Sequence, residues 1–313
     1  MKVFSDPLAV RDIIGQLPTP IAELQFGSIE LLAKLEYLQP TMSIKYRIAR
    51  GLLIDLITSG TLTDSTEWVV EATAGNTAIA LNRALRELRL SARVVAVVSD
   101  KVQRLKIARL QADGIVVRVV PYEVARPTPS TASPLIEALY ATVHELPNAV
   151  IAGQFSSEAN PRAHQLGTGR EIVEQLGVPP DAIVCGAGTG GTITGIARAV
   201  KEAGWNSQIV LADPQGSVLG SAWRGESVAP GKSIIEGIGG DFVPEILDLN
   251  LVDDVVTVPD RESLTAVKRL KQAGFSVGLS SGCAVAASLR LAARDPIISR
   301  CLVLFADHGV WYE

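Results

Sequence analysis

The sequence predicts an α/β fold made of two doubly wound domains with parallel-rich sheets. Three observations support this prediction: apolar runs alternate with amphipathic stretches, aliphatic residues dominate, and 313 residues suit two domains. Hydrophobic residues make up 47% of the chain but aromatic residues only 5%, so Val, Ile, Leu and Ala must fill the core. Such runs are typical of parallel strands that are covered on both faces.

The alternation runs from about residue 65 to the end of the chain. Short apolar runs predict strands over 68–71, 94–98, 115–120, 149–152, 183–186, 209–212 and 302–305. Amphipathic spacing predicts helices over 77–89, 103–111, 134–146, 191–203 and 262–273. The segment 214–240 is rich in Gly, Ser and Pro and predicts a long loop. In such sheets ligands lie beyond the carboxyl ends of the strands, so the loops there are the candidate sites.

Composition excludes several classes of function. The net charge is −4, and no basic stripe indicates a nucleic acid partner. No apolar run approaches the roughly 20 residues that a membrane helix needs, so no membrane partner is expected. The first twelve residues carry charges where a signal peptide needs an apolar stretch, which favours a cytoplasmic location.

Cysteine and histidine spacing gives no sign of a metal. The three cysteines, Cys185, Cys283 and Cys301, form no CxxC pair, and the three histidines show no ligand spacing. We therefore expect no metal site. Cys185 and Cys283 are expected to be small buried fillers.

A glycine-rich segment, GAGTGGT at 186–192, follows a predicted strand and opens a predicted helix. Backbone N–H groups at a helix N-terminus bind phosphate well, and threonine hydroxyls add donors. The simplest alternative is a tight turn without a ligand. The segment lacks the lysine of a Walker loop, because Thr192 stands there. Asp213, about 20 residues further on, leaves a dinucleotide site open.

The segment KLEYLQPTMSIKYR at 34–47 contains a lysine, Lys45, which alone could be an exposed residue after a Ser43 helix cap. The segment resembles the lysine motif of fold-type II pyridoxal-phosphate enzymes, which include cysteine synthase, cystathionine β-synthase and the serine/threonine dehydratases. The resemblance implies that Lys45 holds pyridoxal 5′-phosphate as a Schiff base and is the catalytic base.

Further segments resemble the same family in the same order. They are Ile14-Gly15 with Thr19-Pro20, TAGNT at 73–77, QF at 154–155 with Asn160, Pro161 and His164, GTGGT at 188–192, and GLSSG at 278–282. The resemblance implies a substrate site formed by Thr73, Ala74, Gly75, Thr77, Gln154 and Gly237. It implies a cofactor site formed by Lys45, Asn76, Gly188, Thr189, Gly190, Gly191, Thr192 and Ser280. His164 is expected to be a structural helix residue.

Within the cofactor site, Asn76 is expected at the 3′-oxygen and Ser280 at the pyridine nitrogen. A hydroxyl there suits β-elimination and β-replacement, because it leaves the nitrogen unprotonated. Ser281 is the competing candidate, with a helix cap as its alternative role. The resemblance also implies a cofactor cleft between a smaller, mobile domain at 46–150 and a larger domain formed by 1–45 and 151–313. A homodimer is expected from the family.

Two segments indicate the reaction. Two short runs of this sequence are similar to runs found in cystathionine β-synthase: DPQGS at 213–217 and EGIGGDFVP at 236–244. The resemblance implies β-replacement on L-serine or on O-acetyl- or O-phosphoserine, through an aminoacrylate, with a thiol or sulfide as the nucleophile. In that reaction Lys45 moves the Cα proton.

The sequence departs from the family pattern at two places. Ala74 replaces a usual serine, and Thr41-Met42 stands where two glycines are common. These departures keep three alternatives open: a serine/threonine dehydratase, β-replacement with an amine nucleophile, and a non-catalytic protein that binds the cofactor. The family's dehydratases have a different phosphate loop, GGGGL.

Overall fold

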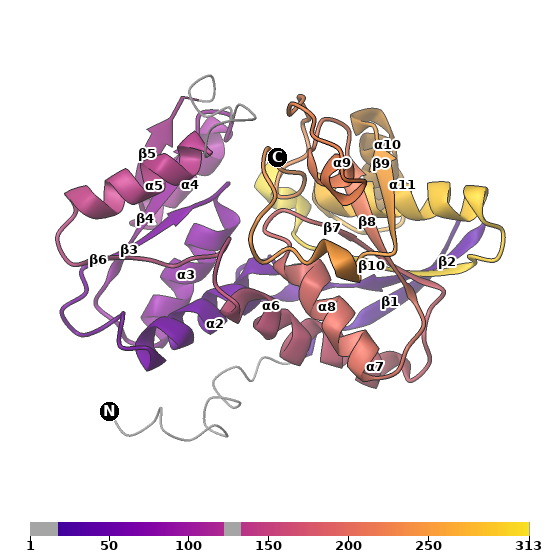
Figure 1. Ribbon diagram of the computed structural model, residues 1–313, viewed down its shortest axis with the longest axis horizontal. Helices are drawn as coiled ribbons and strands as arrows, with labels where there is room; N and C mark the ends of the chain where they lie inside the picture. Colours follow the sequence, from indigo (N-terminus) through magenta and orange to yellow (C-terminus); the bar gives the residue numbers. More distant parts are fainter. Residues whose placement is uncertain (1–17, 122–132, 313) are drawn as a thin grey trace. The chain divides into compact units, whose positions relative to one another are not determined.

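The computed structural model describes residues 18–121 and 133–312. It forms two compact units (Figure 1). Within the described residues, unit 1 is Lys45–Ala159, and unit 2 combines Pro18–Ile44 with residues 160–312. The expected domain boundaries at 46 and 150, and the cofactor cleft between the domains, stay predictions. Ile14 and Gly15 lie outside the described residues.

Unit 1 is a parallel four-stranded sheet in the order β5-β4-β3-β6. Its elements are α2 (Lys45–Thr58), β3 (Trp68–Ala72), α3 (Asn76–Glu87), β4 (Arg93–Ser99), α4 (Arg104–Ala112), β5 (Val116–Val120), α5 (Pro134–Glu145) and β6 (Ala149–Ile151). Alternate residues of each strand face opposite layers. Val69 packs with residues of α2 and α3, whereas Val70 packs with Leu139 of α5. Both faces of the sheet are therefore covered, as Figure 1 shows.

Unit 2 contains a six-stranded sheet in the order β1-β2-β10-β7-β8-β9. Its strands are β1 (Ile21–Phe26), β2 (Ile29–Lys34), β7 (Ala182–Gly186), β8 (Gln208–Pro214), β9 (Asp254–Val258) and β10 (Arg300–Leu304). β1 and β2 form an antiparallel hairpin, and the other pairs are parallel. β10, the last of these strands in the chain, lies between β2 and β7.

Helices cover both faces of this second sheet. They are α6 (Ala159–His164), α7 (Arg170–Leu176), α8 (Gly191–Glu202), α9 (Leu219–Trp223), α10 (Asp260–Gln272) and α11 (Leu279–Arg294). A π-helical turn, η2 (Gln165–Gly169), joins α6 to α7, and short 3-10 helices are η1 (Glu36–Leu38), η3 (Leu249–Leu251) and η4 (Gly309–Tyr312). Val184 packs with α11, and Ile183 packs with α8 on the other face.

The predicted α/β class is confirmed. The predicted strands and helices are present with shifted ends, but the segment 214–240, predicted as a loop throughout, contains α9. The predicted ranges also left out β1, β2, β9, α2, α6, α7 and α11. Among the helices that the structure describes, none combines the length and the apolar character needed to cross a bilayer.

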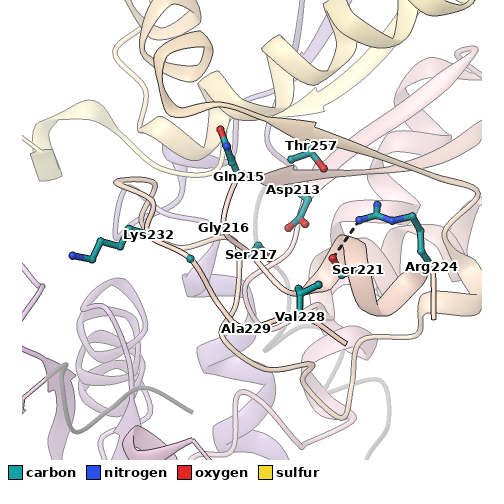
Figure 2. Close-up of a pocket in the computed structure, with 11 residues that line it drawn as sticks. Asp213, Gln215, Gly216, Ser217, Ser221, Arg224, Val228, Ala229, Lys232 and Thr257 are labelled. Carbon is teal, nitrogen blue, oxygen red and sulfur yellow. Dashed lines mark hydrogen bonds between the residues drawn. The ribbon is translucent and has the colours of Figure 1, made fainter. Parts of the chain in front are cut away.

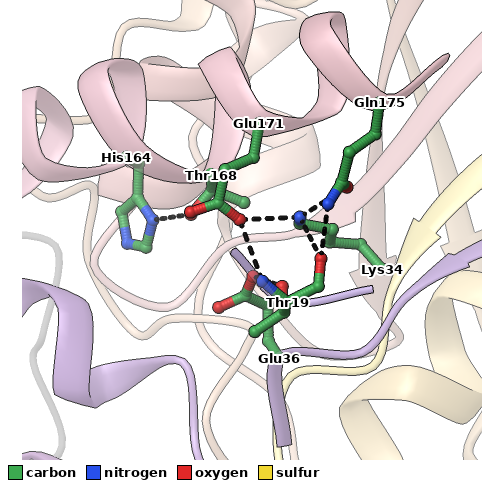
Figure 3. Close-up of polar contacts among 7 residues, drawn as sticks. All are labelled: Thr19, Lys34, Glu36, His164, Thr168, Glu171 and Gln175. Atoms are coloured by element: carbon green, nitrogen blue, oxygen red, sulfur yellow. Dashed lines mark hydrogen bonds and ion pairs between the residues drawn. The ribbon is translucent and has the colours of Figure 1, made fainter. Parts of the chain in front are cut away.

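A buried lysine anchors β2 in unit 2 (Figure 3). Lys34 is fully buried, and its Nζ donates to the Thr19 carbonyl at 2.6 Å, to Glu171 Oε2 at 2.7 Å and to Gln175 Oε1 at 2.9 Å. The Thr19 hydroxyl in turn donates to Glu36 Oε1 at 2.7 Å. Lys34 and Glu36, at the start of the lysine motif, therefore join β2 and the segment around Thr19 to α7.

Candidate active site

Lys45 is the first residue of α2 and is half-buried. The segment before it is fixed by backbone contacts to the chain beyond β10. Ile44 donates to the Ala306 carbonyl at 2.7 Å, and Ser43 forms an antiparallel bridge with Asp307. Met42 has a φ of 52°, in the left-handed region. That conformation costs a non-glycine residue roughly 1–2 kcal/mol, which explains why glycine would suit this position.

The loop after β3 places the predicted substrate segment at the start of α3. Gly75 has a φ of 118°, and a Cβ there would lie 2.9 Å from Lys106 Cε, so the turn requires glycine. The Thr73 hydroxyl accepts the Gly75 N–H at 2.9 Å. Asn76 begins α3, whose N-terminus has no side-chain cap. The first N–H groups of this 12-residue helix can therefore bind a carboxylate.

Gln154, on the segment after β6, joins the same region of unit 1. Its Oε1 accepts from the Thr77 hydroxyl at 2.7 Å, and its Nε2 donates to the Ala72 carbonyl at 2.5 Å. The side chain is buried, with 2% exposed. The structure thus brings Gln154 and Thr77 together, and it shows that both ends of the Gln154 amide bind protein atoms. Direct contact of Gln154 with the substrate stays a prediction.

Sequence reasoning missed Glu71, which is fully buried in β3. Its Oε1 accepts the Ala72 N–H and its Oε2 accepts the Gln154 N–H, both at 2.9 Å. Burial raises the pKa of this carboxyl to about 7, against the opposing effects of the N–H donors and of the Lys45 charge. The sequence did contain a sign of this residue, because a glutamate inside the otherwise apolar strand WVVEA is unusual.

The predicted phosphate loop joins β7 to α8 in unit 2. Its glycines are also required by packing. A Cβ on Gly188 would lie 2.2 Å from the Gly237 carbonyl oxygen, and one on Gly191 would lie 2.0 Å from Asn160 Oδ1. Gly190 has a φ of 84° and forms the N-cap of α8 without a side-chain hydrogen bond. The N-terminus of α8 is therefore open to an anion, as phosphate binding requires.

Residues of α6 hold the two threonines of this loop. Asn160 Nδ2 donates to the Thr189 hydroxyl at 3.1 Å. His164 Nε2 lies 3.1 Å from Thr192 Oγ1, and its Nδ1 lies 3.0 Å from Thr168 Oγ1. His164, expected to be only a structural helix residue, is therefore a direct neighbour of the loop. Asn160 and His164 lie four positions apart and so share one face of α6, which is the pattern in the sequence that could have indicated their contact with the loop.

The two serines at the start of α11 have different surroundings. Ser281 is fully buried, and its hydroxyl accepts the Ala306 N–H at 3.2 Å. Its alternative role as a helix cap is wrong, because Gly278 is the N-cap residue. The Ser280 hydroxyl, on a side chain that is 8% exposed, bonds to none of the residues that the structure describes. A largely buried hydroxyl of this kind is expected to bind a ligand, which fits the predicted contact with the pyridine nitrogen.

The cysteines are buried and free, as expected of core fillers. Burial raises the pKa of Cys185, Cys283 and Cys301 to about 12, so their thiols are not nucleophiles near neutral pH. In the described parts of the chain, no group of three or more His, Cys, Asp or Glu side chains could hold a metal.

A pocket of about 410 Å³ lies at the end of β8 (Figure 2). It is lined mainly by polar side chains: Asp213, Gln215, Ser217, Ser221, Arg224, Lys232 and Thr257. Asp213 is 2% exposed, and its Oδ2 accepts the Gly220 N–H of α9 at 2.9 Å. One oxygen of this carboxyl therefore binds the backbone of α9, whereas Oδ1 bonds to none of the residues that the structure describes.

In unit 2 the open N-terminus of α8 and the largely buried Ser280 hydroxyl are the features expected of a protein that holds a phosphorylated cofactor. The chain belongs to the family described as pyridoxal-phosphate dependent enzyme, whose model matches residues 14–307. This family match confirms the predicted cofactor, pyridoxal 5′-phosphate. The open N-terminus of α8 and the Ser280 hydroxyl show that the residues present fit this group.

Individual relatives agree with this assignment. The chain is 38% identical over 281 residues to a cystathionine beta-synthase of Dictyostelium discoideum, which covers 89% of this chain but only 55% of that protein. It is 34% identical to cysteine synthase B of Campylobacter jejuni, covering 97% and 96% of the two chains. The structure of an O-acetylserine dependent cystathionine beta-synthase from Helicobacter pylori is similar with a TM-score of 0.83 and 32% identity, over 97% of this chain and 96% of that one.

Proposed function

We propose that this protein catalyses β-replacement on L-serine or an O-activated serine, with a thiol or sulfide as the nucleophile. The observation that carries the proposal is the free Ser280 hydroxyl at the start of α11. A hydroxyl leaves the pyridine nitrogen unprotonated and so favours chemistry at Cβ. The names of the relatives, cystathionine beta-synthase and cysteine synthase, support the same reaction.

In this proposal each residue of the site has one task. Bound pyridoxal phosphate supplies the electron sink. The Lys45 amine holds the cofactor and moves the Cα proton of the substrate. The N-terminus of α8 binds the cofactor phosphate, and the N-terminus of α3 binds the substrate carboxylate. Asn76 contacts the cofactor, and Gly237 lies beside the substrate.

Which serine derivative and which nucleophile react is a separate part of this proposal. The similar enzyme from Helicobacter pylori is named as O-acetylserine dependent, which makes O-acetylserine the first compound to test. Another similar structure, with a TM-score of 0.81 and 29% identity, is that of an O-ureido-L-serine synthase. The product in that name contains no sulfur. The O-ureido group is joined to Cβ through oxygen, so that name indicates a nucleophile other than sulfur in the neighbour, and the amine nucleophile stays an alternative from the sequence alone. The cytoplasmic location and the homodimer stay predictions.

The test is turnover by the enzyme loaded with pyridoxal phosphate. Serine and O-acetylserine should each be offered with sulfide, a thiol or an amine, and the products identified by mass spectrometry. We expect a sulfur-containing amino acid, and Lys45→Ala should lower the rate by about 10³-fold or more. Lys201→Ala, at the exposed end of α8, is the matched control and should leave the rate unchanged.

Each alternative predicts a different result. Keto-acid release without any nucleophile would identify a dehydratase, and products with amines alone would identify the amine reaction. Cofactor binding without turnover of any serine derivative would identify a non-catalytic protein and reject the proposal.

A further inference from the structure

Glu71 is a buried carboxyl to which the proposed reaction assigns no task. It lies in β3 of unit 1 with none of its surface exposed. Its Oε1 accepts the Ala72 N–H and its Oε2 accepts the Gln154 N–H, both at 2.9 Å, and the Gly153 N–H also helps to hold its pKa down. One side chain therefore joins the end of β3 to the segment that follows β6.

Both segments lead directly to the residues expected to hold the substrate. The loop from Thr73 to the start of α3 follows Ala72, and the Gln154 side chain reaches back to the Ala72 carbonyl and to Thr77. Glu71, Gln154 and Ala72 thus form a closed set of hydrogen bonds beneath the loop. Burial of a carboxyl is costly, whereas an apolar side chain would fill this place at lower cost. The carboxyl is therefore best explained by the backbone N–H groups that it holds at the end of β3 and in the segment after β6.

We propose that Glu71 is a positioning residue for substrate binding, because its carboxylate fixes the loop 73–77 relative to Gln154. This inference rests on the proposed function, since it takes these two segments as the substrate site. Glu71 itself need not contact the substrate. Its effect on binding is transmitted by the backbone of Ala72 and by Gln154.

The ionisation of Glu71 gives this role a pH signature. Its pKa is about 7, raised from an ordinary value of 4.5 by burial and held down by the N–H donors and by the charge of Lys45. An ionised carboxylate accepts N–H bonds more strongly than a protonated one. Substrate binding should therefore tighten as the pH rises through about 7.

Global stability should follow the opposite trend. Because the folded pKa is raised, the contribution of Glu71 to stability is fully present below pH 4.5 and is lost as the pH rises through about 7. Opposite trends in substrate binding and in unfolding distinguish a positioning role from a loss of overall stability.

Glu71→Gln is the informative variant. A glutamine presents one oxygen and one NH₂ group, so it can accept only one of the two N–H groups. We expect the KM for the serine substrate to rise about tenfold or more, with a smaller change in kcat, and the dependence of KM on pH near 7 to disappear. Glu67→Gln, just before β3, is the matched control, because Glu67 is exposed and its carboxyl accepts from the Asn148 side chain at 3.0 Å. Glu71→Asp keeps the charge and should recover part of the effect.

Amide hydrogen exchange supplies a readout that does not depend on turnover. In Glu71→Gln, exchange at Ala72 and Gln154 should accelerate, while amides of β7 in unit 2 should keep their protection. Unchanged KM together with unchanged exchange would overturn the inference. A uniform loss of protection and a lower unfolding midpoint, with KM and its pH dependence unaffected, would also overturn it.

The two proposals can fail separately. If the wild-type protein converts no serine derivative, the proposed function fails, whereas the exchange experiment still decides whether Glu71 fixes Ala72 and Gln154. If turnover is present and Glu71→Gln retains the wild-type KM at every pH, only the inference about Glu71 fails.

Discussion

The loop after β3 in unit 1 and the loop after β7 in unit 2 share a strand, a glycine-containing turn and an uncapped helix N-terminus. They differ in what holds them. The loop after β7 is bound by Asn160 and His164 of α6 and is also closely packed, because a Cβ on Gly191 would lie 2.0 Å from Asn160 and one on Gly190 would lie 2.4 Å from Leu247. The loop after β3 is held by hydrogen bonds to Gln154, with the ionisable Glu71 beneath.

This difference has a functional consequence. Close packing leaves no space for adjustment without a backbone shift, so the phosphate site should be fixed before the cofactor binds. A hydrogen-bonded loop above a titrating carboxyl can respond to pH. Defects in unit 2 should therefore appear as loss of cofactor, and defects in unit 1 as weaker binding of the substrate.

The largest effect is expected from Lys34→Met, which weakens the framework behind the phosphate loop. Lys34 bonds to Glu171 and Gln175 of α7, and α7 continues from the α6 segment that contacts Thr189 and Thr192. Removal of one partner of a fully buried ion pair costs about 3–5 kcal/mol, and the 13% exposure of Glu171 places this pair at about 3 kcal/mol, the lower end of that range. The free energy of unfolding, measured with urea, should fall by that amount.

The matched control for Lys34 is Arg170→Met. Arg170 pairs with Glu174 on the exposed surface of the same helix, α7. Pairs of this kind contribute only about 0.3–0.5 kcal/mol. Equal losses in the two variants would contradict a special role for the buried pair.

Gly191→Ala tests the rigidity of the phosphate loop directly. The added Cβ would overlap Asn160 Oδ1, so α6 or the loop must move. We expect a cost of about 1–3 kcal/mol in stability and a fall of about tenfold or more in affinity for pyridoxal phosphate. Equilibrium dialysis would measure the cofactor affinity, and urea unfolding the stability.

Gly204→Ala serves as the control in this experiment. Gly204 follows α8 with a φ of 72° and has open space around its Cα. Alanine there adds backbone strain but no clash, so stability should fall while cofactor affinity stays at the wild-type value. If Gly191→Ala also kept wild-type cofactor affinity, the loop would be adjustable and the contrast between the two regions would be lost.

The sequence predicted the positions of both loops, because strand-like apolar runs and glycine patterns are local. It could not reveal what holds them. Lys34 and Glu171 are 137 positions apart, and no spacing rule connects such residues. Glu71 was missed because it stood within a strand-like run that was predicted only as secondary structure. The helix α11 was missed because its first turn, LSSGC, contains the glycine and serines typical of a loop.

Thr77→Val should have the smallest effect and should confine it to unit 1. The change removes the hydroxyl that donates to Gln154 Oε1 at 2.7 Å and keeps the shape of the side chain. Loss of one hydrogen bond of this kind costs about 1 kcal/mol, so the KM for the serine substrate should rise about three- to tenfold. Cofactor affinity should not change, and Thr77→Ser, which keeps the hydroxyl, should stay near the wild-type KM. Loss of cofactor in Thr77→Val would show that the loop after β3 and the loop after β7 do not act separately. A change in KM alone would assign substrate binding to the loop after β3, which Glu71 and Gln154 hold.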